Sequence, residues 1–138
     1  MNLLTVASWE ERFVLGTTRL LNQEKIKRVT VFYYDEFSRR TLTARNSIKR
    51  LCTKKKVACE FVPLKFDHPV GSWTIARQIC FGQRKMIKHA FLDISTMPRD
   101  LIWILLSFLR ELRIKSTYIY NKPAKYHSNW LSRDPGNP

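Results

Sequence analysis

Short apolar runs alternate with longer amphipathic segments along the chain. Runs rich in β-branched and aromatic residues are typical of strands, and five are predicted: Leu3–Ala7, Val29–Tyr34, Val57–Val62, Ala90–Ile94 and Thr117–Tyr120. Between them, apolar residues recur at helical spacing, which predicts helices over Trp9–Ile26, Arg39–Lys56, Trp73–Lys88 and Pro98–Leu112. Pro63 is expected to end the third strand.

This alternation of five strands with four helices indicates an α/β fold. The expected architecture is a Rossmann-like three-layer domain with a mainly parallel five-stranded sheet. The domain is expected to span residues 1–123 and to be followed by an irregular, turn-rich tail over residues 124–138. Two alternatives stay open for the whole chain: a complete small subunit, or the leading domain of something longer.

The residues that follow the strands are the first candidates for a binding site. Parallel strands open their carboxyl ends on one edge, and ligands bind there where the strand order reverses. In the order 3-2-1-4-5, the first and fourth strands are neighbours at that reversal. The candidate ligand-binding residues are therefore Ser8, Trp9, Tyr34, Ser95, Thr96, Asn121 and Lys122.

A turn of small and hydroxyl residues, Ser95-Thr96-Met97-Pro98, joins the fourth strand to the fourth helix. A Ser or Thr ahead of a helix can cap its first N–H groups, and proline is tolerated in the first turn. The free N–H groups and partial positive charge of a helix N-terminus suit a phosphate, to which Arg99 would add a cation. A plain helix cap without a ligand is the alternative.

The stretch "FLDISTMPRDLIWILLSFL" resembles the fourth-strand motif of CRISPR-associated Rossmann-fold (CARF) domains, and "LLTVAS" resembles their first-strand motif. The resemblance implies a cyclic oligonucleotide ligand in a crevice at a dimer two-fold, an effector that receives the signal, and a prokaryotic immunity or signalling setting. It also implies that Ser8, Ser95 and Thr96 contact the ligand. The chain departs from the family at the turn, where Met97-Pro98-Arg99 stands in place of Gly-Gly-Thr-Lys.

The net charge adds a second class of partner. Lys and Arg number 25 against 11 Asp and Glu, a formal charge of +14, which favours polyanions. Many of these cations gather on the second helix with almost no acids among them. They are the candidate nucleic-acid-binding residues: Arg39, Arg40, Arg45, Lys49, Arg50, Lys54, Lys55 and Lys56. A solvated helix face is the alternative.

The motifs of common catalytic and cofactor sites are missing from the sequence. It holds no GxGxxG, GxxxxGK[ST], HExxH or GxSxG, and only four glycines. No cofactor, metal ligand or catalytic residue is therefore predicted, and a binding module is favoured over an enzyme. A metal-dependent, nucleotide-processing enzyme stays open as an alternative because four carboxylates lie near strand ends: Asp35, Glu36, Asp67 and Asp93.

The segment Leu101–Leu109 is apolar at every position except Ser107, so burial on both sides is expected. This predicts a homodimer, or a subunit of a complex, that associates through the segment; the alternative is that Trp130 and Leu131 fold back over it. The segment is too short to span a membrane, and no signal peptide precedes it. Three cysteines without a CxxC pair fit a reduced, cytoplasmic setting.

The sequence therefore favours a nucleotide-binding or sensing module, with a phosphorylated ligand at the strand edge. A basic adaptor subunit for nucleic acid or a partner protein is the second interpretation.

Overall fold

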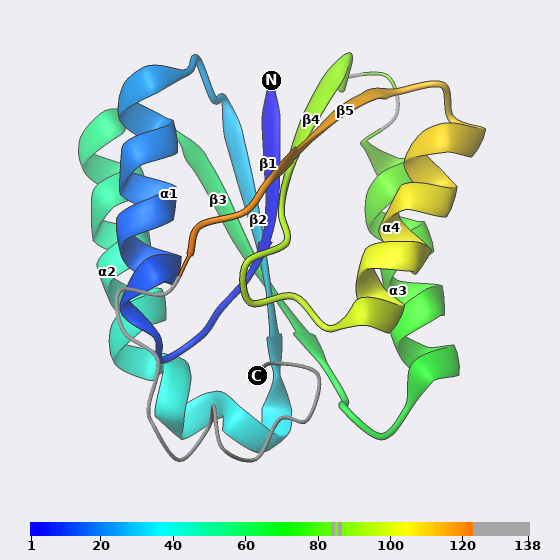
Figure 1. Ribbon diagram of the computed structural model, residues 1–138, viewed down its shortest axis with the longest axis horizontal. Coiled ribbons are helices and arrows are strands. Elements are labelled where there is room, and N and C mark those ends of the chain that lie inside the picture. The colour runs from blue at the N-terminus through cyan, green and yellow to red at the C-terminus, as the bar shows by residue number, and fades with distance from the viewer. Residues whose placement is uncertain (84, 86, 123–138) are drawn as a thin grey trace, which may run out of the picture.

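The computed structural model describes residues 1–83, 85 and 87–122, and within these residues every predicted strand and helix is present. The elements follow one another as shown in Figure 1: β1 (Asn2–Val6), α1 (Glu11–Gln23), β2 (Arg28–Tyr34), a 3-10 turn η1 (Asp35–Phe37), α2 (Ser38–Lys55), β3 (Ala58–Leu64), α3 (Pro69–Gly82), β4 (His89–Asp93), α4 (Arg99–Glu111) and β5 (Lys115–Ile119). The predicted tail over residues 124–138 lies outside the described residues.

The five strands form one sheet in the order β3-β2-β1-β4-β5, and each neighbouring pair is parallel. Helices α1 and α2 cover one face of the sheet, and α3 and α4 cover the other (Figure 1). The predicted three-layer, Rossmann-like α/β fold is therefore confirmed. The strand order reverses between β1 and β4, because the chain builds outward from β1 in one direction and from β4 in the other.

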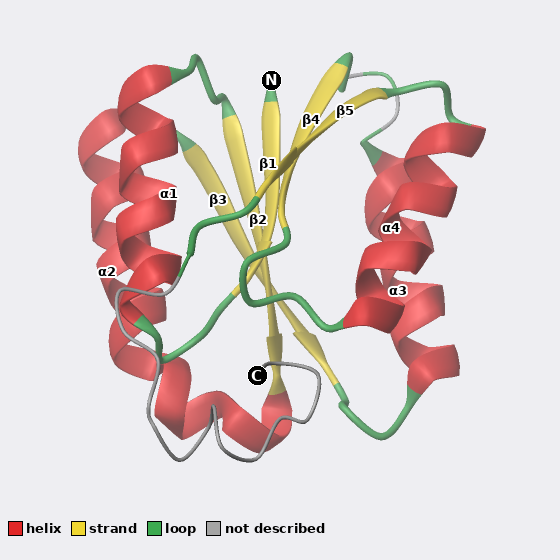
Figure 2. Cartoon of the chain, in the orientation of Figure 1, coloured by secondary structure: helices red, strands yellow, loops and turns green. Residues whose placement is uncertain are grey.

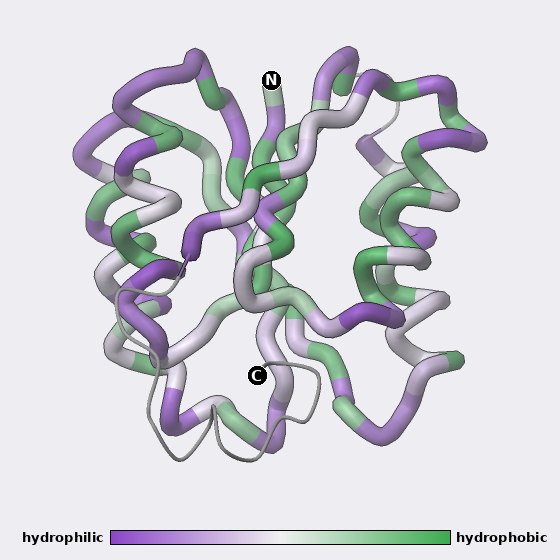
Figure 3. The backbone as a smooth tube through the Cα atoms, viewed as in Figure 1, coloured by the Kyte–Doolittle hydropathy of each residue, from purple (hydrophilic) through white to green (hydrophobic). Residues whose placement is uncertain are grey.

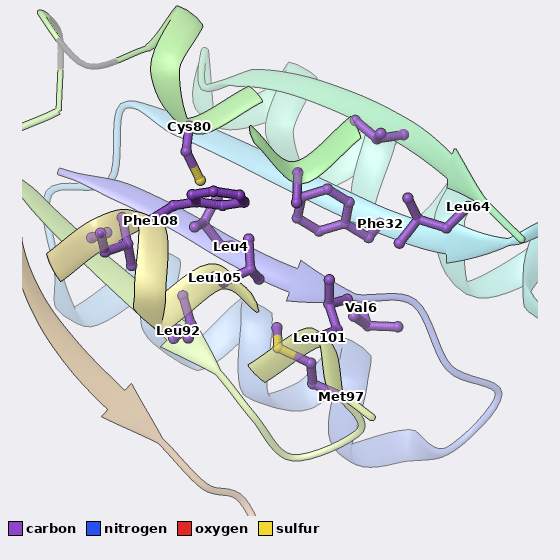
Figure 4. Close-up of a cluster of buried hydrophobic side chains, with 14 of the residues drawn as sticks. Leu4, Val6, Phe32, Leu64, Cys80, Leu92, Met97, Leu101, Leu105 and Phe108 are labelled. Carbon is purple, nitrogen blue, oxygen red and sulfur yellow. The ribbon is translucent and has the colours of Figure 1, made fainter. Parts of the chain in front are cut away.

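Strand β1 explains why both faces of the sheet need a helical layer. Leu4 and Val6 belong to the core beneath α3 and α4, whereas Leu3, one position away, belongs to the core beneath α1 and α2. All three side chains are at most 2% exposed. Figure 4 shows the first of these cores, where Leu105 and Phe108 of α4 meet Leu4 of the sheet. In Figure 3 the strands and the inward sides of the helices are the hydrophobic parts of the backbone.

Boundaries shift by a few residues in several elements, and the shifts in β3 and α3 have clear physical reasons. Strand β3 continues through Pro63 to Leu64, because β3 is an edge strand and a missing N–H is tolerated where no further strand pairs. Helix α3 begins at Pro69 and ends at Gly82, not over Trp73–Lys88. Pro69 occupies the first helical turn, a position that proline favours. The residues from Pro69 to Ser72, which were expected to precede the helix, therefore belong to it.

Helix α4 buries Leu101, Leu105, Phe108 and Leu109. Its far side is only partly covered, since the Trp103 side chain is 67% exposed. Helix α4 is therefore not buried on both sides within the described residues, because one of its apolar residues, Trp103, is exposed. Within the described residues, no helix is both long enough and apolar enough to cross a membrane.

Candidate functional site at the carboxyl ends of β1 and β4

A cavity of about 360 Å³ lies at the carboxyl ends of the strands, where β1 and β4 are neighbours at the reversal of strand order. Figure 2 shows that the loops after β1, β3 and β4 lie at this end of the sheet, together with the helical turn that follows β2. These loops and the adjacent helix ends line the cavity: Val6, Ala7, Ser8, Trp9, Glu10, Arg12, Tyr34, Phe37, Thr41, Phe66, Ser95, Thr96, Met97 and Pro98. Five of the eight predicted ligand-binding residues are among them.

The three predicted residues outside this lining are Arg99, Asn121 and Lys122. Arg99 and Lys122 are exposed. Asn121 lies beneath the site, where its backbone N–H donates to the Ser95 hydroxyl oxygen at 2.7 Å. The side-chain amide of Asn121 lies so close to Gly16 that a Cβ atom added to Gly16 would clash with it. Gly16 of α1 is therefore the residue that lets the end of β5 approach the site.

The Ser95 hydroxyl is fully used by the protein. It donates to Asp93 Oδ1 at 2.5 Å, while the Ser95 backbone N–H donates to the same oxygen at 3.0 Å. The predicted capping role of Ser95 and Thr96 is wrong, because Pro98 is the N-cap of α4 and no side chain caps the helix. The Ser95 hydroxyl donates instead to the carboxylate of Asp93, which lies two residues earlier in the chain.

Thr96 and Ser8 occupy opposite sides of the β1–β4 junction. The Thr96 hydroxyl donates to the Val6 carbonyl at 2.9 Å, so it ties the loop after β4 to the end of β1. The Ser8 hydroxyl oxygen accepts from the Glu10 backbone N–H at 3.1 Å. Within residues 1–83, 85 and 87–122 its own hydrogen has no protein acceptor, so Ser8 has a hydroxyl hydrogen to offer a ligand.

The charged groups in the cavity lining largely satisfy one another. Arg12 forms an ion pair with Glu10 at 2.5 Å and also donates to the Asn121 carbonyl at 3.3 Å. The carboxyl group of Asp93 is buried, and burial raises its pKa above the ordinary value, against the lowering effects of the Ser95 hydrogen bonds and of Arg12. The lining is therefore hydroxyl-rich and nearly neutral, although the chain as a whole carries a formal charge of +14.

Aromatic side chains form one wall of the cavity. Tyr34 and Phe66 meet edge-on with centroids 5.3 Å apart, Phe66 and Phe37 at 5.9 Å, and Phe37 and Trp9 at 5.8 Å. Burial, with smaller contributions from Asp100 and Glu36, raises the pKa of the Tyr34 hydroxyl, which therefore stays neutral. Phe37 and Phe66 were not predicted from the sequence, yet each lies within three residues of a strand end, which is the signal that would have found them.

The four carboxylates considered for a metal-dependent enzyme do not converge. Glu36 accepts the Phe66 backbone N–H at 2.6 Å, and Asp93 is engaged by Ser95. Within the part of the chain that the structure describes, no group of three or more His, Cys, Asp or Glu residues could hold a metal ion.

The basic residues of α2 divide into two groups. Arg45 donates to the Ser38 carbonyl and to the Thr41 hydroxyl, and it lies 4.1 Å above the Tyr33 ring, so it holds α2 against β2. Arg40 lies 3.7 Å above the Trp9 ring. The remaining predicted nucleic-acid-binding residues are exposed on α2 and its C-cap: Arg39, Lys49, Arg50, Lys54, Lys55 and Lys56.

Comparison with known proteins shows what this fold is similar to. No family model matches the sequence, and no curated protein matches it either. Among solved structures, the chain is similar to Can2 from Sulfobacillus thermosulfidooxidans in complex with cyclic tetra-adenylate, at a TM-score of 0.51 and 13% identity over 86% of this chain. AtPrR2 in its apo form also matches over 86% of this chain and 47% of its own, at 10% identity, but its TM-score of 0.36 carries no argument.

The likeness to Can2 confirms, at the level of the fold, the resemblance to CARF domains that the two strand motifs indicate. The chain spans only 31% of the length of Can2.

Proposed function

We propose that this domain is a nucleotide-binding sensor, and that its ligand is a cyclic oligonucleotide bound at the carboxyl ends of β1 and β4. The sensor would act in a prokaryotic immunity or signalling system, in the cytoplasm, where its three free cysteines stay reduced. Ser8, Trp9, Tyr34, Ser95 and Thr96 line the site, and Arg99, Asn121 and Lys122 lie outside its lining.

One observation carries the proposal: the cavity lies where the strand order reverses, in a fold similar to that of a protein solved with cyclic tetra-adenylate. Open α/β sheets bind their ligands at this point of the topology. The lining supports a nucleotide because it combines aromatic rings, which stack on bases, with the Ser8 hydroxyl, which has a hydrogen to donate.

The size of the cavity bears on how such a ligand would bind. A volume of about 360 Å³ falls at the small end of ligand pockets, which run from about 300 to 1,000 Å³. A ring of four nucleotides is larger than the group that such a pocket encloses. We therefore expect each cavity to take part of the ring and a second surface, on another copy of the chain, to take the rest.

Isothermal titration calorimetry with cyclic tetra-adenylate tests the proposal directly. The Ser8→Ala variant should bind about 2- to 12-fold more weakly, as expected for a lost hydrogen bond, while Thr74→Ala on the exposed side of α3 should bind like the native chain. Arg99→Glu should weaken binding strongly, because Arg99 follows Pro98 at the cavity, whereas Arg50→Glu on α2 should leave it nearly unchanged. Equal effects at Arg99 and Arg50 would mean that diffuse charge drives binding, and no heat with cyclic tetra-adenylate would contradict the assigned ligand.

A second function has its own supporting observation. Helix α2 carries no acidic residue between Ser38 and Lys55, and Lys54, Lys55 and Lys56 are exposed at its end. Such a surface suits the phosphate backbone of a nucleic acid or an acidic partner protein. We propose this surface as an alternative or additional binding site, in which case the domain serves as a basic adaptor.

A further inference from the structure

The aromatic wall of the cavity has a geometry that a plain hydrophobic core does not need. Trp9 and Phe66 are 51% and 57% exposed, although both lie in edge contact with Phe37. Each of the two residues therefore leaves about half of its surface uncovered, and both line the cavity. Exposed aromatic rings at a concave site are what single-stranded nucleic-acid-binding proteins use to stack bases.

Trp9 is held in place from its other side. It lines the cavity and also a second hollow between α1 and α2, of about 350 Å³. Arg40 lines this second hollow and not the cavity, and its guanidinium lies 3.7 Å from the Trp9 ring centroid. A cation–π contact of this kind stabilises the orientation of the ring. Arg40 is thus a positioning residue, and it leaves the cavity side of the indole open.

The charges around the wall indicate which part of a nucleotide belongs there. Among the described residues that line the cavity, Arg12 is the only Lys or Arg, and it is already paired with Glu10. Glu36 and Asp100 both act on the neighbouring Tyr34 as negative charges. Arg40, the cation against Trp9, lines the second hollow and not the cavity. On the cavity side a phosphate would therefore meet negative charge and the already paired Arg12, whereas a neutral base would meet polarisable rings and the Ser8 hydroxyl.

We infer that the wall formed by Trp9, Phe37 and Phe66 is a nucleobase-binding subsite, and that the phosphates of the ligand stay at the rim. This inference rests on the proposed function and deepens it, because it says which part of the nucleotide enters the cavity. It also differs from the expectation that the α4 N-terminus binds a phosphate inside the site. The base stacks on the open faces of Trp9 and Phe66, and the Ser8 hydroxyl donates to an acceptor on the base edge or ribose.

The test uses three small probes that separate base from phosphate. By calorimetry at millimolar ligand, adenosine and adenosine monophosphate should bind with affinities within about 3-fold of each other, whereas ribose 5-phosphate, which has no base, should bind at least 10-fold more weakly. Stacking on an aromatic side chain is worth roughly 5- to 150-fold in affinity per base, so Trp9→Leu and Phe66→Leu should each weaken adenosine binding within that range.

Matched controls exist for both substitutions. Trp103→Leu removes an exposed tryptophan from α4, and Tyr118→Leu removes a tyrosine of β5 that is 58% exposed, close to the 57% of Phe66. Both control variants should bind adenosine like the native chain, and thermal melts of all four variants should show that each is folded. The inference is overturned if ribose 5-phosphate binds as well as adenosine, or if the cavity variants behave like their controls.

The outcomes also separate this inference from the proposed function. Binding of cyclic tetra-adenylate that is unaffected by Trp9→Leu and Phe66→Leu would overturn the base subsite and keep the sensor. Binding of adenosine to the wall without binding of cyclic tetra-adenylate would keep the subsite and overturn the assigned ligand. If neither ligand binds, both ideas are overturned.

Discussion

The Ser95 hydroxyl oxygen lies 2.5 Å from Asp93 Oδ1, within the turn that leads from β4 toward α4. Asn121 donates to the same hydroxyl from the end of β5, through its backbone N–H at 2.7 Å and its side-chain amide at 3.3 Å. One buried serine therefore connects two neighbouring strand ends at the floor of the candidate site. Because its hydrogen-bonding groups are already in use, we expect Ser95 to shape the cavity.

Removal of that hydroxyl should destabilise the fold. Ser95→Ala removes one of the two hydrogen bonds to the buried Asp93 carboxylate, whose bond from the Ser95 backbone N–H remains, and it leaves the Asn121 backbone N–H without its partner; an unsatisfied buried group costs about 1–3 kcal/mol. We expect the free energy of unfolding in urea to fall by that amount. Ser107→Ala, at an exposed position of α4, should change it by less than about 0.5 kcal/mol. Equal stabilities of the two variants would show that the Ser95 hydrogen bonds contribute little.

The pH dependence of stability should report on Asp93. Burial raises its native pKa above the ordinary value of 3.8, so the native protein holds this proton more tightly than the unfolded chain does. The stabilising contribution is fully present below about pH 3.8 and is lost as the pH rises through the native pKa. The free energy of unfolding of the native protein, relative to Asp93→Asn, should therefore decrease as the pH rises above about 4.

Urea titrations of both proteins across the acidic range measure this difference. Other carboxylates contribute equally to the two proteins, so they cancel in the comparison. One titrating group limits the slope to about 1.4 kcal/mol per pH unit. Parallel curves, or a native protein that gains stability over Asp93→Asn as the pH rises, would contradict the raised pKa.

The layers and strand order of the fold could be predicted from the sequence because its signals are local and agree with one another. Val29–Tyr34 consists of β-branched and then aromatic residues that the structure buries almost throughout, and each of the first four strands is followed by a helix. The extension of β3 through Pro63 could not be predicted, because it depends on β3 being at the edge of the sheet. That position is a property of the assembled sheet and not of the segment.

The candidate site was predicted in position but not in chemistry. The topology rule places Ser8 and Thr96 at the same edge, and both line the cavity. The hydroxyl of Ser95 was expected at the helix N-terminus, but the pattern of residue types cannot say that Asp93 competes for it at 2.5 Å. Phe37 and Phe66 were missed since aromatic residues just beyond a strand are also common in the core; the structure leaves Phe66 57% exposed, whereas Phe37 is partly buried.

The salt dependence of nucleic-acid binding should reveal whether the end of α2 meets phosphates. Each phosphate of duplex DNA that a lysine neutralises contributes about 0.9 to the slope of log K against log salt concentration. Replacing Lys54, Lys55 and Lys56 together by Gln should therefore flatten the slope measured by fluorescence anisotropy. A matched triple replacement at Arg110, Arg113 and Lys115, which are exposed before and at the start of β5, at the opposite edge of the sheet, should leave it nearly unchanged.

Failure of the native chain to bind DNA or RNA at low salt would remove this surface as a nucleic-acid site. An acidic partner protein would then be the remaining candidate for it. Equal flattening by the two triple variants would mean that the overall charge of +14, and not the end of α2, determines binding.

Association of two copies through α4 is the last expectation, and the exposed aromatic residues beside that helix support it. Trp103 of α4 and Tyr118 of β5 are 67% and 58% exposed, and they line a groove of about 690 Å³ between the helix and the edge strand. Aromatic residues dominate the buried centres of protein interfaces. Sedimentation equilibrium should therefore show a dimer, and Trp103→Ser should weaken it at least 10-fold, whereas Trp9→Leu at the cavity should leave it unchanged.

The ligand should strengthen the same association if the proposed function is right. A ring of four nucleotides exceeds one cavity of about 360 Å³, so a ring shared by two copies favours the dimer by mass action. Cyclic tetra-adenylate should thus lower the dimer dissociation constant, while adenosine, which fills one cavity alone, should not. A monomer that persists at high micromolar concentration with saturating cyclic tetra-adenylate would exclude a shared site, and the ligand would then have to be one that a single cavity can hold.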